Sequence, residues 1–247
     1  MKRYKVLQAQ IDSYNMKQTL EKIEEFIAEK SPHHVITLNA EIIYNAQSDA
    51  KLLKNIQQAD LITPDGAGVV WAIKKLYHQD IERVTGIDLL QHIFPQAAAK
   101  GWKLYFYGGA PGIAEQAAIK IKALYPNIQI VGIDNGYIQN DGQEELQQRI
   151  KAAAPDIIAV ALGAPKQEYW IRENLDLLDI PVMIGVGGSF DVLSGTVNRA
   201  PEIYQKLKVE WLYRLLKEPK RYKRMLVLPK FMKLVRIENK TRGDLDE

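Results

Sequence analysis

An aspartate at the end of an expected β-strand is the residue best placed for acid–base chemistry. Asp65 follows the apolar segment 61–63 and lies between Pro64 and Gly66, in a turn with little conformational freedom. A carboxylate is ionised at pH 7 and can accept the proton of a hydroxyl group that becomes a nucleophile. The same position also suits an N-cap of the helix expected over 67–75, so the catalytic and the structural interpretation both stay open at this point.

Glycine-rich turns follow several other expected strands. They contain Gly108 and Gly109, Gly163, and the run 185–188. Glycine lets backbone amides approach an anion closely, and a helix that begins at such a turn adds the positive end of its dipole. One cluster alone would indicate only a tight turn, but the carboxyl ends of parallel strands share one edge of a sheet. The set therefore predicts a site for a nucleotide or a diphosphate.

Two cations lie in segments expected at the same edge. Arg83 lies in the polar stretch before Thr85 and Gly86, and Lys166 follows the strand expected over 156–162. Either side chain can neutralise an anionic ligand. Each is also compatible with an ordinary surface charge.

The sequence lacks the residues that several other kinds of chemistry need. It contains no Cys, which excludes disulfides, thiolate nucleophiles and Cys-ligated zinc, and its four His show no metal-ligand spacing. Both Gly-x-Gly patterns lack the closing glycine of a dinucleotide-binding fingerprint. The one Asp-x-Asp, at 244–246, has no strand to present it. We therefore expect no metal site and no cofactor.

Alternating strands and helices must position these residues. Short apolar segments predict strands at 34–38, 61–63, 103–107, 128–133, 156–162 and 181–186. An apolar stripe at 16, 20, 23 and 27 predicts a helix capped near Ser13 or Asn15, and Asn39 suits the cap of the helix after the 34–38 strand. The pattern predicts an α/β fold, with a Rossmann-like, mostly parallel sheet flanked by helices.

The length of 247 residues suits one main core with a smaller addition. We expect a Rossmann-like catalytic core over 1–198 and a basic helical appendage over 199–247. Within the appendage, the sequence predicts a helix after Pro201, a second over 220–228 and a third over 230–238, interrupted at Pro219 and Pro229.

Positive charge is concentrated near the C-terminal end. The net charge is +3, but the segment 206–242 carries thirteen Lys and Arg against three Glu, a local balance of +10, and its cations alternate with aromatic residues. This combination favours an anionic, partly apolar surface such as a membrane, although nucleic acid would also attract it and a merely solvated helix face is the commoner outcome. With no spanning segment or signal peptide, we expect a cytoplasmic protein bound peripherally to the inner face of the cell membrane.

Seven motifs carry a family resemblance. They are T-L-N at 37–39, T-P-D-G at 63–66, R-V-T-G at 83–86, G-A-P-K-Q-E-Y-W at 163–170, G-G-S-F-D at 187–191, R-A-P at 199–201 and E-W-L-Y-R at 210–214. Through them the sequence resembles the WecG/TagA/CpsF glycosyltransferase family over most of its length, and within it the TagA branch. The resemblance implies transfer of N-acetylmannosamine from a UDP donor to undecaprenyl-diphosphate-linked N-acetylglucosamine in wall teichoic acid assembly.

The resemblance also implies roles for individual residues. It implies an inverting reaction in which Asp65 is the base, while Arg83 and cations of the C-terminal segment neutralise the departing diphosphate without a metal. The expected cations of that segment are Arg214, Arg221 and Arg224. The residues expected to bind substrate are Thr37, Asn39, Gly108, Gly109, Lys166, Gln167 and Glu168.

The expected partners are a UDP-sugar donor, the undecaprenyl-linked acceptor and an anionic membrane surface, and not nucleic acid. Exposed apolar residues at 203, 212 and 216 would also allow a homo-oligomer in solution. Two alternatives stay open. One is a transferase of the same family with another donor sugar, such as N-acetylmannosaminuronic acid or a hexose; the other is a non-catalytic nucleotide-binding module whose basic tail binds nucleic acid.

Overall fold

A computed structural model gives the arrangement of the chain and describes residues 2–138, 142–201, 204, 213, 222 and 226–243. Its centre is a six-stranded sheet in the order β4-β3-β8-β7-β5-β6, in which all neighbouring strands are parallel. The strands are β3 (His33–Leu38), β4 (Leu61–Pro64), β5 (Lys103–Gly108), β6 (Gln129–Asp134), β7 (Ile157–Ala161) and β8 (Val182–Gly185). This confirms the predicted α/β fold, and each predicted strand coincides with an observed one to within a residue.

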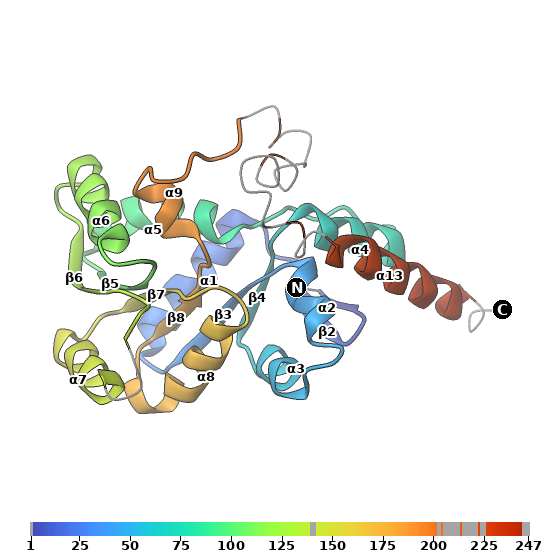
Figure 1. Cartoon of the computed structure of the whole chain (residues 1–247), viewed down its shortest axis with the longest axis horizontal. Coiled ribbons are helices and arrows are strands. Elements are labelled where there is room, and N and C mark those ends of the chain that lie inside the picture. Colours follow the sequence, from blue (N-terminus) through green and yellow to red (C-terminus); the bar gives the residue numbers. More distant parts are fainter. Residues whose placement is uncertain are drawn as a thin grey trace.

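Helices cover both faces of this sheet (Figure 1). They are α1 (Met16–Glu29), α2 (Ala40–Asn45), α3 (Ala50–Gln57), α4 (Ala67–Tyr77), α5 (Gly86–Lys100), α6 (Ile113–Leu124), α7 (Gln143–Ala153), α8 (Lys166–Leu178), α9 (Ser189–Leu193) and α13 (Val227–Gly243). Asn15 caps α1 and Asn39 caps α2, as predicted.

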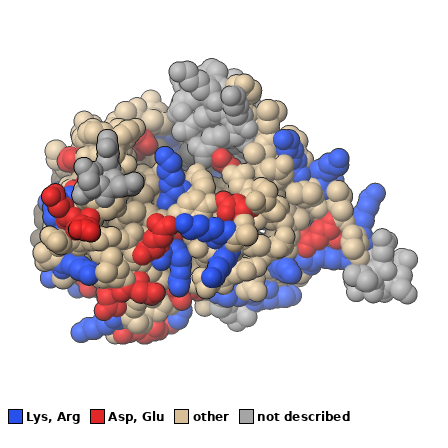
Figure 2. All heavy atoms as spheres, turned by 60° about the horizontal axis from the view of Figure 1, so that its bottom comes forward, with Lys and Arg blue, Asp and Glu red and all other residues tan. Residues whose placement is uncertain are grey.

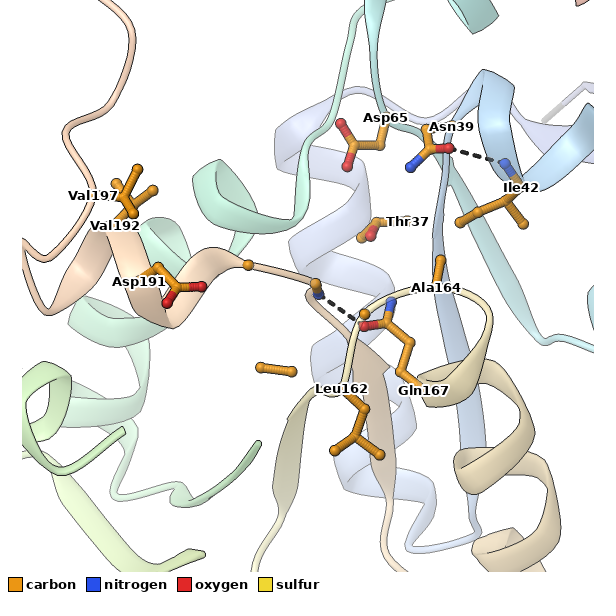
Figure 3. A pocket seen from close by; sticks show the side chains of 14 residues that line it. Thr37, Asn39, Ile42, Asp65, Leu162, Ala164, Gln167, Asp191, Val192 and Val197 are labelled. Atoms are coloured by element: carbon orange, nitrogen blue, oxygen red, sulfur yellow. Dashed lines mark hydrogen bonds between the residues drawn. The ribbon is translucent and has the colours of Figure 1, made fainter. Parts of the chain in front are cut away.

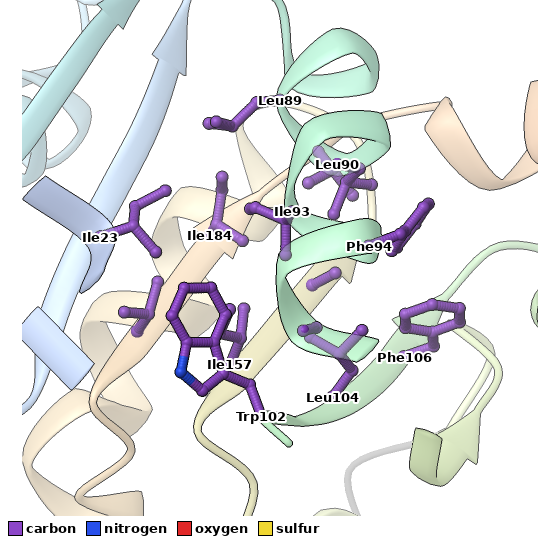
Figure 4. Packing of buried hydrophobic residues seen from close by; sticks show 14 of the residues in the cluster. Ile23, Leu89, Leu90, Ile93, Phe94, Trp102, Leu104, Phe106, Ile157 and Ile184 are labelled. Atoms are coloured by element: carbon purple, nitrogen blue, oxygen red, sulfur yellow. The ribbon is translucent and has the colours of Figure 1, made fainter. Parts of the chain in front are cut away.

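Alternate residues of the strands supply separate cores on the two faces of the sheet. Val35 and Ile157 face α1, α5 and α6, where they join the largest apolar cluster around Phe94 (Figure 4). Their neighbours Ile36 and Ile158 face the other side, toward α2, α3 and α4 or toward α7 and α8. This alternation follows from the period of two in a strand, and it explains why the central strands are apolar throughout.

An antiparallel hairpin precedes the sheet and was not predicted. Its strands are β1 (Arg3–Val6) and β2 (Ala9–Asp12), and Leu7 in the connection has a φ of 55°. Asp12 is fully buried. It accepts a hydrogen bond from the Ile62 backbone N–H (2.8 Å) and forms an ion pair with Arg3 (2.6 Å). The hairpin is thereby attached to edge strand β4.

Helix α13 packs on α2 and α4, which begin at the ends of β3 and β4 (Figure 1). Its Phe231 and Val235 are fully buried in the same cluster as Ile43 of α2. Glu238 accepts a hydrogen bond from the Leu7 backbone N–H at 2.8 Å, which ties the helix to the N-terminal hairpin. Helix α13 therefore supports the helices that lead away from two strand ends.

The predicted interruption at Pro229 is wrong. Helix α13 runs from Val227 through Pro229, which lies in its first turn, where the missing N–H leaves no intrahelical bond unmade. The predicted helix after Pro201 and most of the one over 220–228 lie outside the described residues. The boundary near residue 198 stays a prediction, although α13 contributes to a core shared with the N-terminal half.

Candidate functional site

A cavity of about 340 Å³ opens at the carboxyl ends of four adjacent strands, β4, β3, β8 and β7 (Figure 3). This edge is where open parallel sheets bind their ligands. The described lining residues are Thr37, Asn39, Ile42, Asp65, Ala161, Leu162, Gly163, Ala164, Gln167, Gly187, Gly188, Asp191, Val192 and Val197. Four polar residues predicted from the sequence are among them, Thr37, Asn39, Asp65 and Gln167, and so are Gly163, Gly187 and Gly188 of the predicted glycine-rich turns.

Asp65 lies in the wall of the cavity, half-buried, directly after β4. Its backbone N–H donates to the Leu38 carbonyl of β3 at 2.8 Å, which fixes the turn against the neighbouring strand. The N-cap position of α4 belongs to Gly66, whose φ of 98° suits glycine alone. Asp65 is therefore one residue before the cap, where its side chain reaches the cavity (Figure 3).

Asn39 and Thr37 present polar groups beside Asp65. The Asn39 side-chain oxygen accepts hydrogen bonds from the backbone N–H groups of Glu41 and Ile42, both at 3.0 Å. These two donors fix the orientation of the amide, so the NH₂ group points away from α2 toward the side where Asp65 lies (Figure 3). The Thr37 hydroxyl, which is buried, donates to the Gly185 carbonyl at 2.9 Å and links β3 to β8.

Gln167 holds the opposite wall. Its side-chain oxygen accepts a hydrogen bond from the Gly187 backbone N–H at 2.9 Å (Figure 3), and its NH₂ group donates to Glu168 at 2.9 Å. Glu168 itself is fully buried and does not line the cavity, and its burial raises the pKa of its carboxyl group to about 7. Both residues thus have structural contacts that the sequence prediction of substrate binding did not include.

Gly108 and Gly109 lie at the end of β5 and do not line this cavity. A Cβ on Gly108 would come within 2.4 Å of the Ala161 carbonyl oxygen, and the Gly109 N–H donates to that same oxygen at 2.9 Å. Close packing of β5 on β7 explains Gly108, and a φ of 73° explains the glycine at position 109. Their predicted role in holding a phosphate stays a prediction.

The predicted cations are not part of the described cavity wall. Lys166 is exposed at the start of α8. Arg83 is half-buried in the loop before α5, where the next residue, Val84, donates its N–H to the Pro64 carbonyl (3.1 Å) and accepts a bond from Thr63 (3.1 Å). The loop of Arg83 therefore lies against the turn that carries Asp65. Arg214, Arg221 and Arg224 lie outside the described residues.

The described wall of the cavity carries two acidic side chains and no Lys or Arg. The second acid is Asp191, from α9, on the far side from Asp65 (Figure 3). Asp191 was missed as an individual site residue, although the G-G-S-F-D motif after β8 pointed to its position. The wall also has an apolar part that no sequence pattern indicated, formed by Leu162, Val192 and Val197. Within the described ranges, no three His, Asp or Glu side chains are grouped as metal ligands.

The chain matches the glycosyl transferase WecG/TagA/CpsF family over residues 4–244. It belongs to this family. A curated relative from Bacillus spizizenii, named N-acetylglucosaminyldiphosphoundecaprenol N-acetyl-beta-D-mannosaminyltransferase, is 37% identical over 201 residues, which is 81% of this chain and 77% of the relative. Family membership confirms the predicted glycosyltransferase. It disfavours the alternative of a non-catalytic nucleotide-binding module.

None of the helices in the described ranges is both long enough and apolar enough to cross a bilayer.

Proposed function

We propose that this glycosyltransferase moves N-acetylmannosamine from UDP-N-acetylmannosamine to undecaprenyl-diphosphate-linked N-acetylglucosamine, with inversion at the anomeric carbon. The name of the relative supports the transferred sugar and the acceptor. The observation that carries the mechanism is the placement of Asp65 in the cavity wall, beside Asn39 and across from Gln167 and Gly187. The resemblance to the TagA branch supports UDP as the carrier.

In this mechanism a single displacement forms the new glycosidic bond. The acceptor hydroxyl oxygen attacks the anomeric carbon while the bond to the UDP oxygen breaks, and UDP leaves with the bonding electrons. The Asp65 carboxylate takes the hydroxyl proton as general base. The amide of Asn39, which its two backbone donors orient, is available to donate to a donor or acceptor oxygen beside Asp65.

The departing diphosphate needs positive potential that the described cavity wall does not supply, because its charged members are acids. We assign this task to Arg83, whose loop packs on the Asp65 turn, and to Arg214, Arg221 and Arg224. The assignment is metal-free because arginine and backbone N–H groups can neutralise a diphosphate directly.

The acceptor has an isoprenoid chain, so the enzyme must meet a membrane. Helix α13 supports this requirement with four exposed cations along its outer face, Lys230, Lys233, Arg236 and Lys240. Ile237 lies among them with 51% of its surface exposed. Lys and Arg side chains are visible on the side of the molecule where α13 lies (Figure 2). Each cation near an anionic leaflet contributes about 1 kcal/mol, which is enough for reversible peripheral binding.

The test is the transfer rate of Asp65→Asn with a lipid-linked acceptor. We expect kcat to fall about 100-fold or more, because the base is lost, while UDP binds with near wild-type affinity. Asp191→Asn removes the same charge from the other side of the cavity and should keep most of kcat. Near-normal turnover of Asp65→Asn would refute the role of the base.

The donor sugar is tested separately, with a panel of labelled UDP sugars. Preference for UDP-N-acetylmannosamine is expected. Faster transfer of a uronic acid or a hexose would assign the protein to another activity of the same family.

A further inference from the structure

Glu168 is a buried acid that the proposed reaction does not use. It lies in the first turn of α8 with no exposed surface. One carboxyl oxygen accepts a hydrogen bond from the Gln167 side chain (2.9 Å), and the other is buried with no hydrogen-bond partner in the described part of the chain. A carboxyl group buried with one unbonded oxygen is costly, so its presence needs an explanation.

The contact with Gln167 decides which way round that side-chain amide lies. The amide oxygen accepts from the Gly187 N–H, and the amide nitrogen donates to Glu168. If the amide turned over, its NH₂ group would face the N–H of Gly187, and its oxygen would face a carboxyl oxygen. The first contact would then pair two donors, and the second would pair two acceptors whenever Glu168 is ionised.

The site has little room for another arrangement of this amide. A Cβ on Gly185 would lie 2.6 Å from the amide nitrogen of Gln167, so the amide lies directly against the end of β8. Gly187, which the amide holds, has a φ of 54° and lines the cavity, with open space where a Cβ would be. The Gly187 N–H therefore depends on Gln167 for its hydrogen-bond partner, and the acceptor at position 168 adds to that N–H in fixing the orientation of the amide.

We propose that Glu168 is a positioning residue for the sugar-nucleotide site. Its carboxyl group orients the Gln167 amide, and that amide fixes Gly187 in the cavity wall. Glu168 does not touch the ligand. The assignment of the ligand rests on the proposed function, but the positioning of Gly187 does not.

Two substitutions of similar size should have different effects on substrate binding. Glu168→Gln can still offer a side-chain oxygen to Gln167, whereas Glu168→Met offers no acceptor while filling a similar volume. We expect Glu168→Gln to keep the wild-type KM for the UDP-sugar within about twofold. Glu168→Met should raise KM about tenfold, the usual effect of one hydrogen bond, with a smaller change in kcat. Glu173→Met, at an exposed position of the same helix, is the matched control.

A double-mutant cycle tests the route through Gln167. If Glu168 acts only by orienting that amide, Glu168→Met should add no further increase in KM in a Gln167→Leu background. A full tenfold increase in KM in that background would overturn the proposal. An equal increase in KM in Glu168→Gln and Glu168→Met would overturn it as well. So would a wild-type KM in Glu168→Met.

Hydrogen exchange of the Gly187 amide distinguishes failure of this proposal from failure of the proposed function. Measured without ligand, it should be at least tenfold faster in Glu168→Met and unchanged in Glu168→Gln, with circular dichroism confirming that both variants are folded. Unchanged exchange in Glu168→Met overturns the positioning role. If wild type transfers no N-acetylmannosamine but exchange responds as expected, only the proposed function is wrong.

Discussion

The stability of the protein should depend on pH through Glu168, and the substitution Glu168→Gln isolates this dependence. Burial raises the pKa of Glu168 from 4.5 to about 7 in the folded state. Between pH 4.5 and pH 7 the folded protein therefore keeps the carboxyl proton of Glu168, whereas the unfolded chain has released it. The free energy of unfolding must therefore contain a contribution that is complete below pH 4.5 and is lost as the pH rises through 7.

The size of the effect follows from the shift. One unit of pKa corresponds to about 1.4 kcal/mol, so Glu168 should lower the unfolding free energy by about 3 kcal/mol between pH 4.5 and pH 8. The side chain of Glu168→Gln cannot ionise, so its unfolding free energy should not fall in this way. Between pH 4.5 and pH 8, the unfolding free energy of the variant should therefore rise by about 3 kcal/mol relative to that of wild type.

His34 produces the opposite slope and must be separated from Glu168. Burial, with a smaller contribution from Arg172, lowers the pKa of its imidazole from 6.5 to about 3, so its contribution to stability is complete above pH 6.5 and is lost as the pH falls toward 3. Between pH 4.5 and 6.5 the two groups partly cancel in wild type. The difference between the two proteins removes the His34 term, because both retain that residue.

The assay is urea unfolding at pH values from 4 to 8, followed by tryptophan fluorescence. Asp176→Asn, at an exposed position of α8, controls for the loss of one negative charge. A difference in unfolding free energy between wild type and Glu168→Gln that stays constant over the whole range would contradict a raised pKa, because it would mean that Glu168 titrates alike in the folded and unfolded states.

Three further predictions concern packing and chemistry. Gly108→Ala should destabilise the protein by about 3 kcal/mol or more in urea unfolding, since its Cβ would meet the Ala161 carbonyl at 2.4 Å at a φ of 124°; a loss below about 1 kcal/mol would contradict this packing. Phe231→Ala should cost about 3 to 5 kcal/mol in the same assay, because Phe231 is fully buried, whereas the exposed Ile237→Ala on the same helix should cost under about 1 kcal/mol; equal costs would show that α13 does not pack on the core. Transfer should persist in EDTA, because the diphosphate is assigned to arginines and backbone amides; activity that EDTA abolishes and Mg²⁺ restores would overturn that assignment.

The sequence predicts the sheet well because its strands are buried on both faces. Such strands appear as continuous apolar segments between helix signals, and Asn15 and Asn39 cap their helices in the expected way. The N-terminal hairpin was missed because its strands are only four residues long and its connection contains Leu7 in place of a glycine.

The prediction of the site was clearest where a residue follows its strand directly. Asp65 and Asn39 meet in the cavity because β4 and β3 are neighbours with parallel carboxyl ends. The contact between Gln167 and Gly187 joins residues twenty positions apart, and no local pattern indicates it. Gly108 looked like part of a phosphate site because a glycine required by packing against Ala161 has the same sequence signal as one required by a ligand.

A crystal structure with UDP bound is the decisive test of the sugar-nucleotide site beside Asp65. UDP should lie in the cavity between Asp65 and Gly187, with the β-phosphate close enough to the Asp65 carboxylate for a sugar to lie between them. UDP bound at another edge of the sheet, or an Asp65 carboxylate turned away from the ligand and bonded only to the first turn of α4, would contradict it.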